Sequence, residues 1–245
     1  RRNKHPQFID RIKALQPDVL ISAGHQKILP ETVLDIPRIA AVNFHPSLLP
    51  EGRGRNPCFW TIVTGQKETG VTAHHMVAGA DQGDILIQKS IPLTGEETYS
   101  SLYDRLTGLS VEMIPETLDL CRTGSPPRIP QPEGEWPMYG EPAEQDYHIR
   151  WSDDAETIER LIRAGMDHPG AFMHIMGERI VVCEVRVEDS IDASPGTILE
   201  ISEHCVCVAT GDGRLWLERM RTEDDTSSAV DIARGFGLKP GDRLE

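Results

Sequence analysis

Residues 39–50 read IAAVNFHPSLLP, and this stretch decides the fold class. Its first six residues form a short apolar run of small and β-branched side chains, which is typical of a buried strand in a parallel sheet. Residues 45–57 follow with prolines and glycines, which indicates a loop. A similar run, VLISAG at residues 19–24, comes earlier in the chain. Two buried strands at this spacing predict an α/β domain.

Helical patterns alternate with these two strands, so we expect residues 1–123 to form a partial, Rossmann-like parallel sheet covered by helices. Apolar residues recur at helical spacing in residues 6–15, ahead of the first strand. The further elements that the patterns predict are a short helix at 30–36, a helix from 58 to 63, strands at 70–77 and 85–91, and a long helix within 94–121.

Residues 124–143 are rich in proline and glycine, a composition that indicates an extended, semi-rigid linker. Beyond it the pattern changes to one helix, with Ser152 as its predicted cap, followed by short strands and glycine-containing turns. We therefore expect residues 144–245 to form a small OB-like β-barrel domain. Its predicted strands are residues 171–175, 179–187, 196–201, 205–209 and 214–221.

The charge of the chain is −14, and the acidity is concentrated in the second half. Residues 151–245 hold 20 Asp and Glu against 10 Lys and Arg, a net charge of −10, which repels phosphate backbones and disfavours nucleic acid as a partner. No apolar run is long enough to span a bilayer, and no signal peptide opens the sequence, which predicts a soluble, cytoplasmic protein. The five cysteines are scattered without a CxxC pair, so reduced thiols and no metal site are expected. An oligomer is compatible with this composition.

Asn43 and His45 stand where the strand at 39–44 ends, and their spacing of two directs them to the same side. Ligands bind at the carboxyl ends of strands in open α/β sheets. Taken alone, the pair is equally consistent with a strand-end histidine and a turn-capping asparagine. A second polar cluster, AGADQGD at residues 78–84, offers a carboxylate at Asp81, although an ordinary Asp-Gly turn is its commoner meaning.

An asparagine, a histidine and a carboxylate suit acyl transfer to an amine. Asn43 and a protonated His45 can donate hydrogen bonds to the oxyanion that forms. Asp81 can accept the proton of the amine or orient the imidazole. No Ser or Cys nucleophile is needed, because neither Ser47 nor Cys58 has a base and an orienting group around it. We interpret Ser47 as a turn former.

Three strings in the first half together resemble the signatures of folate-dependent formyltransferases: NFHPSLLP at 43–50, GVTAHHM at 70–76 and DQGDIL at 81–86. In the second half, three further strings are similar to the C-terminal barrel domain of that family: DHPGAF at 167–172, PGTIL at 195–199 and ATGDG at 209–213.

The resemblance implies that Asn43, His45 and Asp81 are catalytic, and that N10-formyltetrahydrofolate is the co-substrate, with no metal. It also implies a folate pocket between two segments, for which the expected residues are Gly24, His25, Lys27, Ile28 and Leu29 on one side and Ala78, Gly79 and Ala80 on the other. For the two basic residues, His25 and Lys27, plain solvent exposure is an equal alternative. The expected substrate-binding residues are Ser47, Arg53, Asn56 and His74.

The loop RNPCFW at residues 55–60 resembles the branch of the family that formylates small amines. Methionyl-tRNA formyltransferases typically carry Gly or Ala where this chain has Pro46. The resemblance therefore implies a small-molecule amine acceptor, such as a nucleotide-linked amino sugar or a hydroxyornithine-type siderophore precursor, with tRNA as the alternative. A non-catalytic folate-binding relic is a further alternative, disfavoured because all three polar residues are present. For Phe59 and Trp60, core packing is the commoner structural meaning of such an apolar pair in a helix.

Members of this family open with a βαβ unit ahead of the helix that here occupies residues 6–15, whereas this sequence begins at Arg1. The sheet is therefore expected to lack its first strands and to expose an edge.

Overall fold

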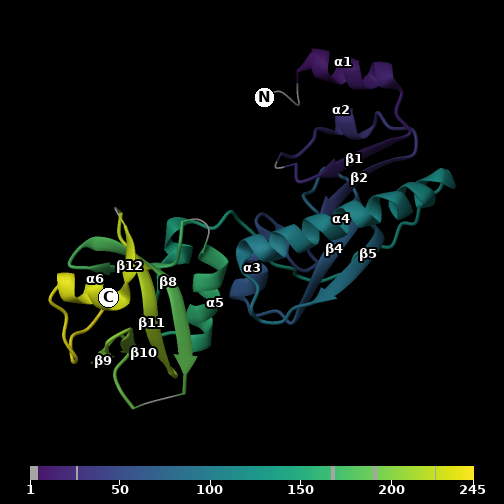
Figure 1. The fold of residues 1–245 in the computed structure, drawn as a ribbon. Coiled ribbons are helices and arrows are strands. Elements are labelled where there is room, and N and C mark those ends of the chain that lie inside the picture. Colours follow the sequence, from purple (N-terminus) through teal and green to yellow (C-terminus); the bar gives the residue numbers. More distant parts are fainter. Residues whose placement is uncertain (1–4, 26, 167–168, 190–191, 224) are drawn as a thin grey trace. The chain divides into compact units, whose positions relative to one another are not determined.

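The computed structural model describes residues 5–25, 27–166, 169–189, 192–223 and 225–245. The chain divides into two compact units (Figure 1). Among the described residues, no helix combines the length and the apolarity that crossing a bilayer requires. The first unit comprises residues 1–61, 66–94 and 101–141, and the second comprises 62–65, 95–100 and 142–245.

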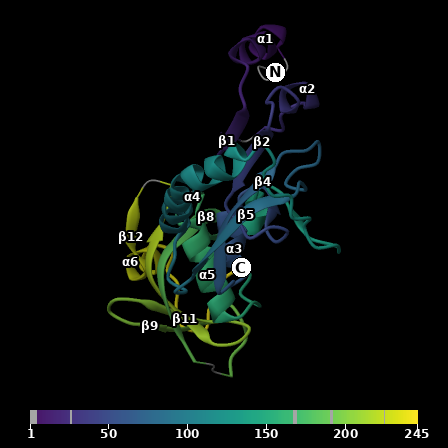
Figure 2. The same cartoon turned by 90° about the vertical axis from the view of Figure 1, so that its right-hand side faces the viewer.

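A four-stranded sheet in the order β1-β2-β4-β5 forms the centre of the first unit (Figures 1 and 2). β1 (Val19–Ala23) and β2 (Ala40–His45) are parallel, as predicted. β4 (Glu68–His75) and β5 (Ile85–Pro92) each run antiparallel to their neighbours, so the sheet is mixed. The loop between β4 and β5 is too short for the crossover that parallel strands need, which explains why β5 runs antiparallel to β4.

The helices of this unit lie where the sequence predicts them, with ends shifted by a few residues. The long helix α4 carries its buried residues at helical spacing and runs along the sheet in both views (Figures 1 and 2). β1 is an edge strand of the sheet, and the helix α1 that precedes it has no buried residue. The helices are α1 (Pro6–Leu15), α2 (Glu31–Leu34), α3 (Pro57–Val63) and α4 (Tyr99–Arg122).

The Pro-rich segment is extended, as its composition indicates, but up to residue 141 it is part of the first unit. Ile129 forms an antiparallel bridge with Ile85. Further along, β6 (Met138–Tyr139) pairs in parallel with the short strand β3 (Arg53–Gly54). Trp60 reinforces this pairing, because its ring stacks on Tyr139 at 5.1 Å between centroids. The extended backbone thus serves as a pairing partner for the first unit rather than only as a spacer.

The second unit is a curled antiparallel half-barrel in the order β7-β8-β11-β10-β9, with β12 paired to β11. This confirms the predicted barrel-like β domain. In the part of the chain that the structure describes, no pairing joins the end strands β7 and β9, so the barrel is not closed. The elements are η2 (Glu144–Tyr147), α5 (Ala155–Gly165), β7 (Phe172–Ile175), β8 (Glu178–Glu188), β9 (Ile198–Ile201), β10 (Val206–Ala209), β11 (Arg214–Arg221), β12 (Thr226–Ser228) and α6 (Ala229–Gly235).

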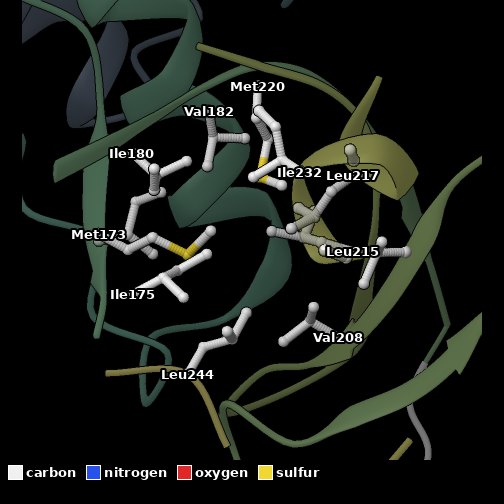
Figure 3. Close-up of a cluster of buried hydrophobic side chains, with 14 of the residues drawn as sticks. Met173, Ile175, Ile180, Val182, Val208, Leu215, Leu217, Met220, Ile232 and Leu244 are labelled. Carbon is white, nitrogen blue, oxygen red and sulfur yellow. The ribbon is translucent and has the colours of Figure 1, made fainter. Parts of the chain in front are cut away.

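Alternating apolar residues of these strands form the core of the second unit (Figure 3). Ile180 and Val182, two apart on β8, are 0% and 1% exposed, as strand periodicity requires. The helix α5 covers this core. Its cap is Asp154, whose carboxylate accepts a hydrogen bond from the backbone N–H of Thr157 at 2.7 Å. The predicted cap at Ser152 was wrong, because residues 151–153 form a turn and Asp154, in an extended conformation, directly precedes the helix.

Candidate functional site

The polar residues at the end of β2 meet a histidine of β4. The register places Asn43 directly opposite His74. Residues that are opposite each other in an antiparallel pair project to the same face, so the two side chains meet there. Asn43 Nδ2 is 3.2 Å from His74 Nε2. His45 follows two residues after Asn43 on the same strand and shares this face, as predicted.

Asp81 completes the arrangement from the loop between β4 and β5. Its Oδ1 lies 3.6 Å from His45 Nδ1 and 3.5 Å from His74 Nε2. All three side chains are largely buried, with exposed fractions of 14%, 6% and 3% respectively. The backbone N–H of Gly54 donates to Asp81 Oδ2 at 3.0 Å and fixes the carboxylate from the other side. We call Asn43, His45, His74 and Asp81 the Asp81 cluster.

The electrostatics of the cluster favour a neutral His45 beside an ionised Asp81. Burial lowers the pKa of His45, an effect that the Asp81 charge and the Gly52 carbonyl oppose without cancelling. For Asp81, burial raises the pKa, but the hydrogen bond from His74, the nearby His45 and the N–H of Gly54 together bring it below its ordinary value. The lowered pKa favours the neutral ring in the free chain, whereas the sequence, which does not reveal how deeply the imidazole is buried, suggested a protonated His45.

The hydrogen-bond partners of the two imidazoles define where their hydrogens lie. His45 Nε2 is 2.8 Å from the carbonyl of Gly52, so this nitrogen donates and the neutral ring leaves Nδ1 bare toward Asp81. His74 Nδ1 donates in the same way to the carbonyl of His75 at 3.0 Å. His74 Nε2 then donates to Asp81 when the ring is protonated and accepts from Asn43 when the ring is neutral. The bare Nδ1 of His45 and the carboxylate of Asp81 face each other and can take up a proton between them.

The other predicted substrate residues have different surroundings. Ser47 is 3% exposed and its hydroxyl donates to the carbonyl of Glu51 at 2.7 Å, which agrees with a turn former. Arg53 donates to the side chain of Gln131 at 3.0 Å. Asn56 has a φ of 54°, a left-handed conformation that asparagine tolerates better than most residues. Contact of these residues with a substrate stays a prediction, whereas His74 lies in the cluster itself.

The two segments that the resemblance assigns to folate leave the sheet near the cluster. Gly24 follows Ala23, which pairs with Phe44 beside His45. Ile28 is 66% exposed and Val77, next to Ala78 at the end of β4, is 43% exposed. Exposed apolar side chains on both segments fit a flat ring system that would cover them. Gln26, inside the first segment, lies outside the described residues, as do Asp167 and His168 in one of the resembling strings.

Sequence reasoning missed Gly54 and Gln131. Gly54 has a φ of 105°, and a Cβ at this position would lie 2.1 Å from the carbonyl oxygen of Tyr139. Its N–H also holds Asp81. The glycine could have been noted as a turn signal, but its role depends on a strand pairing with residues far along the chain. Gln131 lies in the Pro-rich segment, where nothing in the local pattern points to the cluster.

Replacing Gly54 with Ala is expected to lower the free energy of unfolding by about 1–3 kcal/mol, because the new Cβ collides with backbone and the φ is strained. Gly108→Ala is the matched control. A Cβ at Gly108, inside α4, meets nothing within 4 Å, so this change should stabilise the protein by about 0.5–1 kcal/mol. Urea unfolding followed by circular dichroism measures both. A wild-type midpoint for Gly54→Ala would mean that the pairing of β3 with β6 gives way easily.

Comparisons with known proteins identify the family of the chain. A family model described as Formyl transferase matches residues 1–118, and one described as Formyl transferase, C-terminal domain, matches residues 143–237. A methionyl-tRNA formyltransferase of Syntrophus aciditrophicus is 33% identical over 240 residues, which cover 97% of this chain and 77% of that protein.

Two solved structures share the fold. HypX from Aquifex aeolicus, solved in complex with tetrahydrofolic acid, matches with a TM-score of 0.68 at 24% identity, over 98% of this chain and 44% of that chain. An N-formyltransferase from Helicobacter canadensis, solved with folinic acid and dTDP-3-aminofucose, matches with a TM-score of 0.64 at 18% identity, over 81% of this chain and 72% of that chain.

Proposed function

Because the chain belongs to the formyl transferase family, we propose that it transfers the formyl group of N10-formyltetrahydrofolate to the amine of a small molecule. The observation that carries the proposal is the Asp81 cluster. Oδ1 of the ionised Asp81 carboxylate lies 3.6 Å from Nδ1 of His45 and 3.5 Å from Nε2 of His74. An amine that attacks a formyl carbon must lose a proton, and this cluster is built to receive one.

The residues of the cluster divide the chemistry between them. Asn43 has two amide N–H groups, and only one is directed at His74. The second can donate to the formyl oxygen as negative charge develops on it. His45 and Asp81 take up the proton of the attacking amine, so that a cation forms next to the oxyanion. The same proton then passes to N10 of the folate as the bond between the formyl carbon and N10 breaks.

The folate would lie against residues 24–29 and 78–81. Exposed Ile28 and Val77 provide apolar cover for the pteridine ring, and Gly24, with a φ of 68°, leaves its backbone accessible. The other residues assigned to this pocket are His25, Lys27, Leu29, Ala78, Gly79 and Ala80.

Charge supports a small acceptor over tRNA. The net charge of residues 151–245 is −10. Many arginines of the second unit also lie next to carboxylates, which lowers the positive potential that a phosphate backbone would meet. The arginine–carboxylate pairs within this range are Arg160–Glu156, Arg163–Glu159, Arg186–Glu188, Arg214–Glu188, Arg219–Glu184 and Arg234–Asp231.

Methionyl-tRNA is the second candidate acceptor. The observation in its favour is the name of the Syntrophus relative, with which this chain shares 33% identity over both of its units. Formyl transfer is common to the two candidates, and only the acceptor differs.

A panel of acceptors tests the proposal with formyl donor present: a nucleotide-linked amino sugar, N-hydroxyornithine and methionyl-tRNA, each analysed by mass spectrometry. We expect formylation of a small amine, at a rate that changes little with salt. Formylation of methionyl-tRNA alone, with an affinity that falls by about 10³ or more between about 50 and 200 mM salt, would mean that the acceptor is tRNA and not a small amine. No product with any acceptor and no calorimetric binding of tetrahydrofolate would contradict formyl transfer itself.

A further inference from the structure

The first part of the Pro-rich segment lies along the loop that carries Asp81. Ile129 and Ile85 exchange two backbone hydrogen bonds, at 2.8 and 3.0 Å. Just before them, the carbonyl of Pro127 accepts a hydrogen bond from His75 Nε2 at 2.9 Å. These contacts join residues about fifty positions apart in the chain and bring the side chain of Gln131 next to Asp81.

Gln131 binds the backbone of the loop that carries Asp81 and also the side chain of Arg53, on the strand β3. Its Nε2 donates to the backbone carbonyl of Asp81 at 2.7 Å and to that of Gly83 at 2.8 Å. Its Oε1 accepts a hydrogen bond from Arg53 at 3.0 Å. Arg53 directly precedes Gly54, whose N–H holds Asp81 Oδ2. One amide therefore ties the Asp81 loop to the strand that orients its carboxylate.

The loop needs such a tie because its conformation is strained. Asp81 adopts a φ of 55°, which is uncommon for a residue other than glycine. A Cβ on Gly83 would lie 1.8 Å from the carbonyl oxygen of His75, so the loop passes very close to the end of β4. Strained backbone of this kind persists only where surrounding contacts hold it. Gln131 binds the carbonyls of both residues, Asp81 with its positive φ and Gly83 at the close approach to β4.

We infer that Gln131 is a positioning residue, which holds Asp81 at its distance from His45 and His74. It does not touch the reacting atoms and acts through the loop. The catalytic meaning of this inference rests on the proposed function, but the geometry itself can be tested without any substrate. The Pro-rich segment is then a part of the active site and not only a connection between two units.

Three variants separate the roles of the amide. Gln131→Met keeps the length and removes both the donor and the acceptor. Gln131→Glu keeps an acceptor for Arg53 but removes the two N–H donors. Glu133→Gln, an exposed change in the same segment, is the matched control. Asp81→Asn serves as the reference for loss of the carboxylate.

The primary measurement is the titration of the imidazole signals of His45 and His74 by NMR, in the full chain without substrate. The Asp81 charge raises the pKa of His45, so moving the carboxylate away should shift the His45 titration to lower pH. We expect Gln131→Met to shift it in the same direction as Asp81→Asn, and Gln131→Glu to change the His45 and His74 signals as well. Glu133→Gln should leave both as in the wild type, and circular dichroism reports whether each variant is folded.

In formyl-transfer assays, Gln131→Met and Gln131→Glu should lower kcat by about 10- to 100-fold, with KM for the folate within a few-fold, since about 1 Å of misplacement can have such an effect. Unchanged His45 and His74 titrations in folded Gln131 variants overturn the inference, whatever the kcat. Absence of formyl transfer in the wild type would contradict the proposed function instead, and the NMR result would still decide the role of Gln131.

Discussion

Asp81→Asn is expected to lower kcat by about 10²–10⁴-fold, the range that a positioned acid–base group contributes. The amide keeps the shape and can still accept from Gly54, but it removes the charge that makes the cluster a proton acceptor. Folate affinity should stay within a few-fold, because the backbone of residues 78–81 is unchanged. Steady-state kinetics with the identified acceptor give kcat, and calorimetric titration with tetrahydrofolate gives the affinity.

Asp84→Asn is the matched comparison for this variant. Asp84 is on the same loop, but its carboxylate is directed to Arg128 at 3.5 Å and not to the histidines. Its kcat should stay within a few-fold of the wild type. Near wild-type turnover of Asp81→Asn, together with a large loss in Asp84→Asn, would transfer the proposed role to Asp84.

His45→Ala should lose more activity than Asn43→Ala. The imidazole both takes up the proton and becomes a cation beside the oxyanion, whereas Asn43 offers one neutral donor, whose loss should lower kcat by about 10²–10³-fold. The losses of His45→Ala and Asp81→Asn should be far from additive in the double variant, because both residues act on one proton transfer. Additive losses would mean that the two residues act in separate steps.

The pH dependence distinguishes the same two residues. The pKa of His45 lies below its ordinary value of 6.5 because of burial. Above that pKa the neutral imidazole can accept the proton of the amine. As the pH falls through the pKa, the imidazole is already protonated. The rate should therefore fall on the acid side and stay flat near neutrality. Asn43→Ala should keep this acid limb, while His45→Ala should lose it. Circular dichroism at each pH checks that the variants are folded.

The sequence alone was enough for the elements and for part of the site. Apolar runs with strand or helix periodicity identified β1, β2, the long helix and the strands β7 to β11 of the second unit, because burial of one face imposes such patterns locally. The short strand β12 was not predicted. The spacing of Asn43 and His45 placed them on one face for the same reason. The order of polar strings along the chain was sufficient to recognise the family resemblance and to name Asp81.

Tertiary structure decided what depends on pairing between distant residues. The antiparallel register of β4 on β2 brings His74 opposite Asn43, and no pattern within either strand contains that information. Burial, which follows from the surrounding fold, lowers the pKa of His45 and so favours the neutral ring where the sequence suggested a cation. Gln131 reaches the loop of Asp81 only because the Pro-rich segment folds back along it. A local sequence pattern records which face of an element is buried, whereas the partner of that face is chosen by long-range packing.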